Sequence, residues 1–152
     1  MDNIITKQLE GWLYRVAQEI ANIAQNEAPT RTRNLRNDIK VYKKGELTFS
    51  ISNSRIAAYA PYVHFGTGIY GPKKRKIVPK NAKALKIPID GKIIYRKSVK
   101  GQKPNPYMSR AVDIYLQEGI QRAISSLDSN IADIIGRQIR QELKSIKITV
   151  KV

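Results

Sequence analysis

The chain contains no cysteine and only one histidine among its 152 residues. Disulfide bonds, thiolate metal sites and cysteine nucleophiles are therefore excluded. No apolar run approaches the roughly 18 consecutive residues of a membrane-spanning helix, so we expect no membrane partner. The first residues lack a basic start followed by a long apolar stretch, and we expect no signal peptide. At this length, a single domain over residues 1–152 is the expected organisation.

Acidic residues are also scarce. The chain has 12 Asp and Glu against 28 Lys and Arg, a formal net charge of +16. The excess is in the middle: 20 basic and three acidic residues lie between Arg31 and Arg110, whereas the two ends together hold eight basic and nine acidic residues. Such a concentration of positive charge attracts polyanions in a salt-dependent way. The pattern favours DNA near the middle region, with the solvated surface of an assembly subunit as the alternative.

Apolar residues recur every three or four positions over residues 3–27, which predicts an amphipathic helix. Pro29 ends this helix, because the residue before a proline is pushed away from the α conformation. The stripe that we expect to face the core consists of Ile5, Leu9, Trp12, Leu13, Val16, Ile20 and Ile23.

A second amphipathic helix is predicted to open at Asn105-Pro106 and to carry its apolar face to Leu127. The apolar pattern continues to Ile139, either in the same helix or after a break at Asp128-Ser129. The last segment, Ser145–Val152, alternates strictly and predicts an edge strand that a neighbouring subunit could complete.

Two segments show the alternation that is typical of antiparallel hairpins. Residues 39–51 alternate around a predicted turn at Lys43–Glu46. Ala84–Ile89 and Lys92–Arg96 flank Asp90-Gly91, a strong signal for a hairpin with a two-residue loop.

Ala57–Phe65 is apolar, but Pro61 in its middle argues against a central strand and predicts a short helix or an irregular packed segment. Two basic loops, Gly66–Lys83 and Ser98–Pro104, flank the second hairpin, and we expect both to be mobile. The order of elements predicts an α+β fold: a mostly antiparallel β-sheet with a long N-terminal and a long C-terminal helix packed on it, plus mobile basic loops.

No set of residues typical of catalysis is recognisable. Gly66–Gly71 matches G-x-G-x-x-G, but Pro72 and a basic run follow where a dinucleotide-binding helix would begin, so we interpret these residues as loop glycines. His64 has no nucleophile motif, orienting acid or further metal ligand beside it, and we interpret it as a packing or interface histidine. The sequence therefore predicts no catalytic residue, cofactor or metal ion, and no enzymatic activity.

Several aromatic residues lie beside basic ones, the combination that single-stranded nucleic-acid binders use for base stacking. No ribonucleoprotein signature and no five-strand oligonucleotide-fold pattern accompanies them, so core and subunit contacts are favoured. The candidate subunit-interface residues are Tyr59, Tyr62, His64, Phe65 and Tyr107.

Short sequence blocks follow one another within residues 1–125. These blocks are Ala28-Pro29 leading into Thr32–Ile39, Tyr59–Thr67, Lys83–Leu85 with Arg96–Val99, and Pro104–Met108 with Ala111. Their order and spacing resemble the tail-completion and neck proteins of long-tailed bacteriophages. In that family the patterns are Thr-Gly-x-Leu-Arg-x-Ser-Ile, Tyr-Ala-x-x-Val-Glu-Phe-Gly-Thr, Lys-Ala-Leu with Arg-Lys-Ser-Val, and Pro-x-Pro-Phe.

The chain departs from the family pattern at three positions. Arg33 stands where glycine is usual, His64 where glutamate is usual, and Asp38 where a small hydroxyl residue is usual. Residues 126–152 form a C-terminal extension with a helix-like and then a strand-like pattern. This extension has no clear match in the family, so no property of the family is assigned to it.

The resemblance implies a structural virion protein at the phage head–tail junction, assembled in the cytoplasm of the bacterial host into a homo-oligomeric ring around the DNA channel. Its implied partners are other neck and tail proteins and the genomic DNA, contacted without sequence preference. Charge density predicts which residues face that channel. These candidate DNA-channel residues are Lys73, Lys74, Arg75, Lys76, Lys80, Lys83, Lys97, Lys100 and Lys103.

A stand-alone basic nucleic-acid-binding protein is the alternative, and an enzyme is a third and weaker one. The first two differ in the DNA affinity of the isolated chain. Sub-micromolar binding at physiological salt favours the nucleic-acid-binding protein, whereas weak and purely electrostatic binding favours the neck protein.

Overall fold

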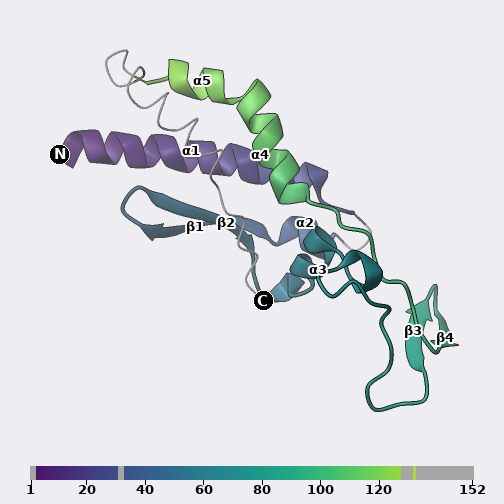
Figure 1. Ribbon diagram of the computed structural model, residues 1–152. Helices are drawn as coiled ribbons and strands as arrows, with labels where there is room; N and C mark the ends of the chain where they lie inside the picture. Colours follow the sequence, from purple (N-terminus) through teal and green to yellow (C-terminus); the bar gives the residue numbers. More distant parts are fainter. Residues whose placement is uncertain (1–2, 31–32, 128–131, 133–152) are drawn as a thin grey trace. The chain divides into compact units, whose positions relative to one another are not determined.

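The computed structural model describes residues 3–30, 33–127 and 132. The chain divides into two compact units. Met1–Ala58 together with Tyr107–Val152 form one, which we call the helical unit, and Tyr59–Pro106 form the other, which we call the basic unit. A single domain over residues 1–152 stays a prediction. Figure 1 shows the elements with their labels.

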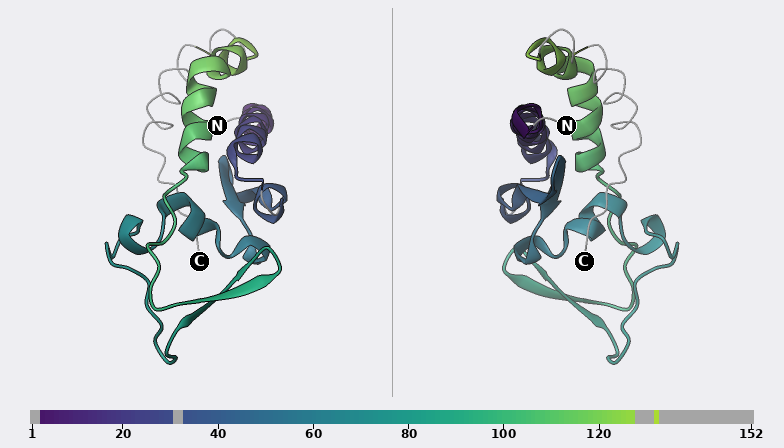
Figure 2. Two further views of the ribbon diagram at one scale, coloured as in Figure 1. Left: turned by 90° about the vertical axis from the view of Figure 1, so that its right-hand side faces the viewer. Right: turned by 90° about the vertical axis from the view of Figure 1, so that its left-hand side faces the viewer.

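The first helix, α1, spans Asn3–Glu27 and ends two residues before Pro29, as predicted. It lies alongside α4, Tyr107–Glu118, in both directions of view (Figures 1 and 2). The buried residues of α1 include both bulky members of the predicted stripe and alanines, whose small side chains leave room for close packing. The buried apolar residues are Trp12, Val16, Ala17, Ile20, Ala21 and Ala24, and Thr6 is buried as well.

The C-terminal helical segment is not the single long helix that we predicted up to Leu127. It begins at Tyr107, α4 ends at Glu118, and a shorter helix, α5, covers Ile120–Ser125. Gly119 separates the two, and a Cβ added to it would lie 2.5 Å from the buried ring of Tyr115. The ring therefore occupies the space beside position 119, which leaves room there only for a glycine.

The two ends of the helical pair are joined by polar contacts. The Trp12 indole Nε1 donates a hydrogen bond to the carbonyl of Ala123 in α5 at 2.6 Å. At the other end, Arg110 Nε donates to the Glu27 carboxylate at 2.8 Å, and its guanidinium also donates to the Glu27 carbonyl at 3.2 Å. The prediction that Trp12 belongs to the core is confirmed.

Substitution of Gly119 by alanine tests the break between α4 and α5. Gly119→Ala is expected to lower the free energy of unfolding by about 1–3 kcal/mol, because the new Cβ overlaps the buried Tyr115 ring. Gly11, inside α1, is the matched control, since a Cβ there meets no atom within 4 Å. Gly11→Ala is expected to raise the free energy of unfolding by about 0.5–1 kcal/mol. Urea denaturation followed by circular dichroism measures both, and equal effects would contradict this packing.

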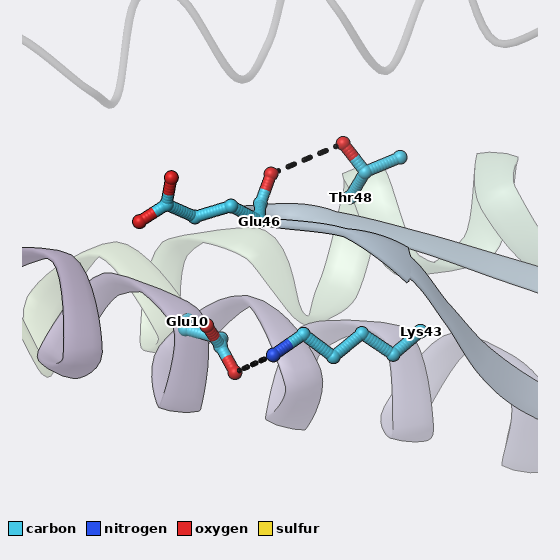
Figure 3. Close-up of polar contacts among 4 residues, drawn as sticks. All are labelled: Glu10, Lys43, Glu46 and Thr48. Carbon is cyan, nitrogen blue, oxygen red and sulfur yellow. Dashed lines mark hydrogen bonds and ion pairs between the residues drawn. The ribbon is translucent and has the colours of Figure 1, made fainter.

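A first antiparallel hairpin belongs to the helical unit. It consists of β1, Ile39–Gly45, and β2, Thr48–Asn53. Its turn lies at Glu46 and Leu47, later than predicted, with Leu47 in the left-handed region at φ 54°. The Thr48 hydroxyl donates to the Glu46 carbonyl at 3.3 Å and so closes the turn (Figure 3).

This hairpin packs on α1. The Tyr14 and Phe49 rings lie 5.6 Å apart, centre to centre, in a tilted arrangement. Lys43 Nζ lies 2.5 Å from Glu10 Oε1 (Figure 3). An exposed ion pair of this kind contributes only about 0.2–1 kcal/mol, so the apolar contacts carry most of the attachment.

A second antiparallel hairpin, β3 (Leu85–Ile89) with β4 (Lys92–Arg96), belongs to the basic unit. Its loop is Asp90-Gly91, as predicted, with φ values of 49° and 76° that are typical of a mirror-image hairpin turn. The predicted short helix is α3, Ala60–Phe65. The remaining short elements are α2 (Asn34–Asn37), η1 (Arg55–Ala57) and η2 (Gly68–Tyr70).

The α+β class is confirmed, and both sheets are antiparallel, but the strands do not form one sheet. Each hairpin pairs only with itself within the described residues, because β1–β2 and β3–β4 belong to different compact units. The predicted continuation to Ile139 and the predicted strand Ser145–Val152 lie outside the described residues, apart from residue 132.

Candidate nucleic-acid and subunit interface

Two segments of the basic unit, one on each side of the β3–β4 hairpin in sequence, are joined through their backbones. The Thr67 N–H donates to the Gln102 carbonyl at 2.9 Å, and the Ile69 N–H donates to the Lys100 carbonyl at 2.8 Å. The Gln102 N–H in turn donates to the Thr67 hydroxyl at 2.8 Å. These three bonds join the start of the first predicted basic loop to Lys100 and Gln102 within the second.

Glycines make this close approach possible. Gly68 (φ 64°) and Gly101 (φ 97°) both have positive φ values, which residues with a side chain rarely adopt. A Cβ on Gly68 would lie 2.0 Å from the Lys100 carbonyl oxygen, and one on Gly101 would lie 2.2 Å from the Thr67 carbonyl oxygen. The glycines of the G-x-G-x-x-G match therefore serve a close backbone contact between the two loops, and the match contains only a three-residue helix, η2.

The contact between the two segments extends in both directions. Ile77 and Val99 exchange reciprocal backbone hydrogen bonds of 2.9 and 3.0 Å, an isolated antiparallel bridge nearer the hairpin. On the other side, the Asn105 N–H donates to the Val63 carbonyl in α3 at 2.8 Å. The loops are thus anchored at several points, and their predicted mobility stays a prediction.

Positive charge is concentrated on this framework. The basic unit has 48 residues, of which 12 are Lys or Arg and only Asp90 is acidic, a net charge of +11. The nine candidate DNA-channel residues are all exposed. Among the described residues none of the nine forms an ion pair, since both observed pairs lie in the helical unit. Lys103 does contact an aromatic face, with its Nζ 6.0 Å from the centre of the Tyr70 ring.

The five candidate interface residues fall into two groups. Tyr59, directly before α3, and Tyr62 and Phe65 in α3 are exposed and follow one another at a spacing of three. His64 and Tyr107 are instead 4% and 0% exposed. The His64 ring lies edge-on to Phe65 at 4.5 Å, and the Tyr107 hydroxyl donates to Asn53 at 2.8 Å. These two side chains serve packing within the chain and offer almost no area to a second subunit.

Asp38 is a structural centre that the sequence analysis did not identify. Its carboxylate is buried and accepts hydrogen bonds from the Ser54 N–H at 2.7 Å, the Ser54 hydroxyl at 2.5 Å and the Ala57 N–H at 3.1 Å. Asp38 therefore fixes η1 against the end of α2. Its departure from the family pattern was visible, but its partners lie too far along the chain to be recognised from spacing.

Asn53 connects further parts of the helical unit. Its side-chain amide donates to the Leu35 carbonyl at 2.9 Å, while its oxygen accepts from the Tyr107 hydroxyl. Asn53 and its partners hold these elements in position.

Burial raises the pKa of the Tyr115 hydroxyl well above its usual range, and the negative charge of Glu19 raises it further, so this group stays neutral.

In the part of the chain that the structure describes, no group of three His, Asp or Glu residues is placed to hold a metal ion. No described helix is both long and apolar enough to cross a bilayer. The features that remain as a candidate site are the exposed basic residues and the aromatic side of α3.

Residues 1–66 match the model of a family described as "Bacteriophage HK97-gp10, putative tail-component". The matched region includes α1, the β1–β2 hairpin and α3, and it covers the first sequence block and nearly all of the second. The match confirms the resemblance to phage tail and neck proteins over these residues and relates the protein to structural components of the phage virion. No curated protein and no solved structure matches the chain.

Proposed function

We propose that this protein is a structural subunit of the head–tail junction of a long-tailed phage, a neck or tail-completion protein that forms part of a ring around the DNA channel. The match of residues 1–66 to a phage tail family carries the proposal. Its partners are other neck and tail proteins, with which it assembles in the host cytoplasm, and it performs no catalysis.

Ring assembly needs a surface on each subunit that contacts a different surface on the next. The exposed residues Tyr59, Tyr62 and Phe65 supply one such surface, because they lie on α3 and directly before it, and aromatic side chains offer large contact area, to which the tyrosines add a polar tip. His64 and Tyr107 are left out of this surface, since both are buried.

The DNA channel requires a lining that accepts a passing polyanion of any sequence. The nine exposed candidate residues, eight in the two loops and Lys97 directly before the second, meet this requirement, because Lys and Arg contact phosphates without reading bases. We therefore assign these loops to the lumen of the ring.

A stand-alone nucleic-acid-binding protein remains the second candidate, favoured by the net charge of +11 on the basic unit. The affinity of the purified chain for duplex DNA separates the two. Weak binding that disappears with added salt agrees with the neck protein, whereas sub-micromolar binding at physiological salt favours the second candidate.

A phage carrying an early stop codon in this gene tests the proposed function. DNA-filled heads and separate tails are expected to accumulate in lysates, because heads and tails would no longer join. Electron microscopy of the particles measures this outcome, with the same phage supplied with the intact gene from a plasmid as the control. Normal tailed and infectious particles without the protein would remove it from the junction.

A further inference from the structure

The β3–β4 hairpin is an unusual element, because it has no core of its own. None of its ten residues is buried. Within the described residues no third strand pairs with it, and Figure 2 shows it as a long two-stranded ribbon. A two-stranded hairpin alone is only marginally stable in water, so this ribbon is expected to be stabilised by something that binds to it.

Both edges of the ribbon carry features that oppose the addition of another strand. In a hairpin with a two-residue loop, Ile89 and Lys92 form the closing hydrogen-bonded pair, so the backbone nitrogen of Pro88 faces away from β4. Proline has no N–H to donate there. The β4 edge carries Lys92 and Arg96, and charged residues blunt an edge.

The two faces of the ribbon combine cations with exposed apolar groups. The register places Lys86 opposite Tyr95 and Pro88 opposite Ile93 on one face, while Arg96 and Lys92 lie on the other. Lys86, Lys92 and Arg96 are exposed. Tyr95 and Ile93 are 64% and 51% exposed, which is high for large apolar side chains.

Charge decides which partner fits this surface. Pairing with the same ribbon of a second copy would bring Lys86, Lys92 and Arg96 against three equal charges, with Asp90 as the one acid on each ribbon, and is disfavoured. A polyanion with phosphates on both sides would instead match cations on both faces of a narrow ribbon. The major groove of duplex DNA has this geometry and admits a two-stranded β-ribbon.

We propose that the β3–β4 ribbon inserts into a groove of the double-stranded DNA that passes the protein. Lys86, Lys92 and Arg96 contact the phosphates, while Ile93 and Tyr95 contact sugars and base edges without selecting a sequence. The inference rests on the proposed presence of DNA in the channel. It adds three cations outside the two loops to the predicted DNA contacts.

The test compares two triple variants of the full chain with equal loss of charge. The ribbon triple is Lys86→Gln, Lys92→Gln and Arg96→Gln. The control triple is Lys7→Gln, Lys40→Gln and Arg55→Gln, at exposed positions of the helical unit. Binding to a fluorescent duplex of mixed sequence is measured by anisotropy between about 50 and 200 mM salt.

The ribbon triple is expected to make the slope of log K against log salt shallower by about 2–3, because each lost phosphate contact removes about 0.9 from it. Affinity at the lower end of the salt range, where phosphate contacts contribute most, falls at least tenfold. The control triple changes the slope by less than about 1. The exchange variant Lys86→Arg, Lys92→Arg, Arg96→Lys keeps the charge and is expected to keep the slope, which separates charge from folding.

Two outcomes would overturn the ribbon assignment. One is an equal change of slope in the ribbon and control triples. The other is a loss of oligomers by the ribbon triple in sedimentation without DNA, which would make a second copy the partner. The junction role is judged separately: if the stop-codon phage accumulates unjoined heads and tails while the ribbon triple binds DNA like the control, only the ribbon assignment fails.

Discussion

Replacing Gly68 by alanine is expected to lower the free energy of unfolding of the basic unit by about 3 kcal/mol or more. Two costs add. Alanine is strained at a φ of 64°, and its Cβ would lie 2.0 Å from the Lys100 carbonyl oxygen, a backbone atom that cannot rotate away. The Thr67–Gln102 and Ile69–Lys100 hydrogen bonds must therefore lengthen or break.

Gly91 provides the matched control for this substitution. It also has a positive φ, 76°, but a Cβ there meets no atom within 4 Å. Gly91→Ala is thus expected to cost only the conformational strain, about 1 kcal/mol. Urea denaturation gives the total effect, and hydrogen exchange of the Thr67 and Ile69 amides locates it. An effect of Gly68→Ala no larger than that of Gly91→Ala would contradict the close contact between the two segments.

Asp38→Ala is expected to lower the free energy of unfolding of the helical unit by about 3–5 kcal/mol. The substitution removes three hydrogen bonds to one buried carboxylate and leaves the N–H of Ala57, itself buried, without its acceptor. Bonds to an ionised acceptor are stronger than neutral ones, and the unsatisfied donors add their desolvation cost.

The control for Asp38 is Asp113→Ala in α4, which removes an exposed carboxylate and is expected to change stability by less than about 0.5 kcal/mol. Ser54→Ala adds a double-mutant test. It is expected to cost about 1–2 kcal/mol alone and about 1 kcal/mol less after Asp38→Ala, because its hydroxyl then keeps only the cap contact with the Ile56 N–H. Additive effects of Asp38→Ala and Ser54→Ala in thermal denaturation would argue against this network.

Sequence patterns predicted the elements whose causes are local. The apolar period places Trp12, Val16 and Ile20 on the buried side of α1, and Asp90-Gly91 supplies the two positive φ values of the hairpin loop. The break at Gly119 was missed, because a lone glycine is a weak signal until the position of the Tyr115 ring is known.

Contacts between distant positions could not be predicted from the sequence. The carboxylate of Asp38 contacts Ser54, and Gly68 contacts Lys100, only after the chain has folded. The burial of Tyr107, a candidate interface residue, was likewise not predicted, since aromatic residues serve both core and surface and composition does not distinguish them. The cations of β3–β4 were not among the predicted DNA contacts, because they alternate with apolar residues instead of forming a basic run.

A reconstruction of the intact phage neck by electron cryomicroscopy tests the central claim most directly. We predict a ring of copies of this protein at the head–tail junction, with Lys73–Lys83, Lys97–Lys103 and the β3–β4 ribbon facing the DNA density in the lumen. A ring in which these segments point outward, or a junction that contains no copy of the chain, would contradict the account.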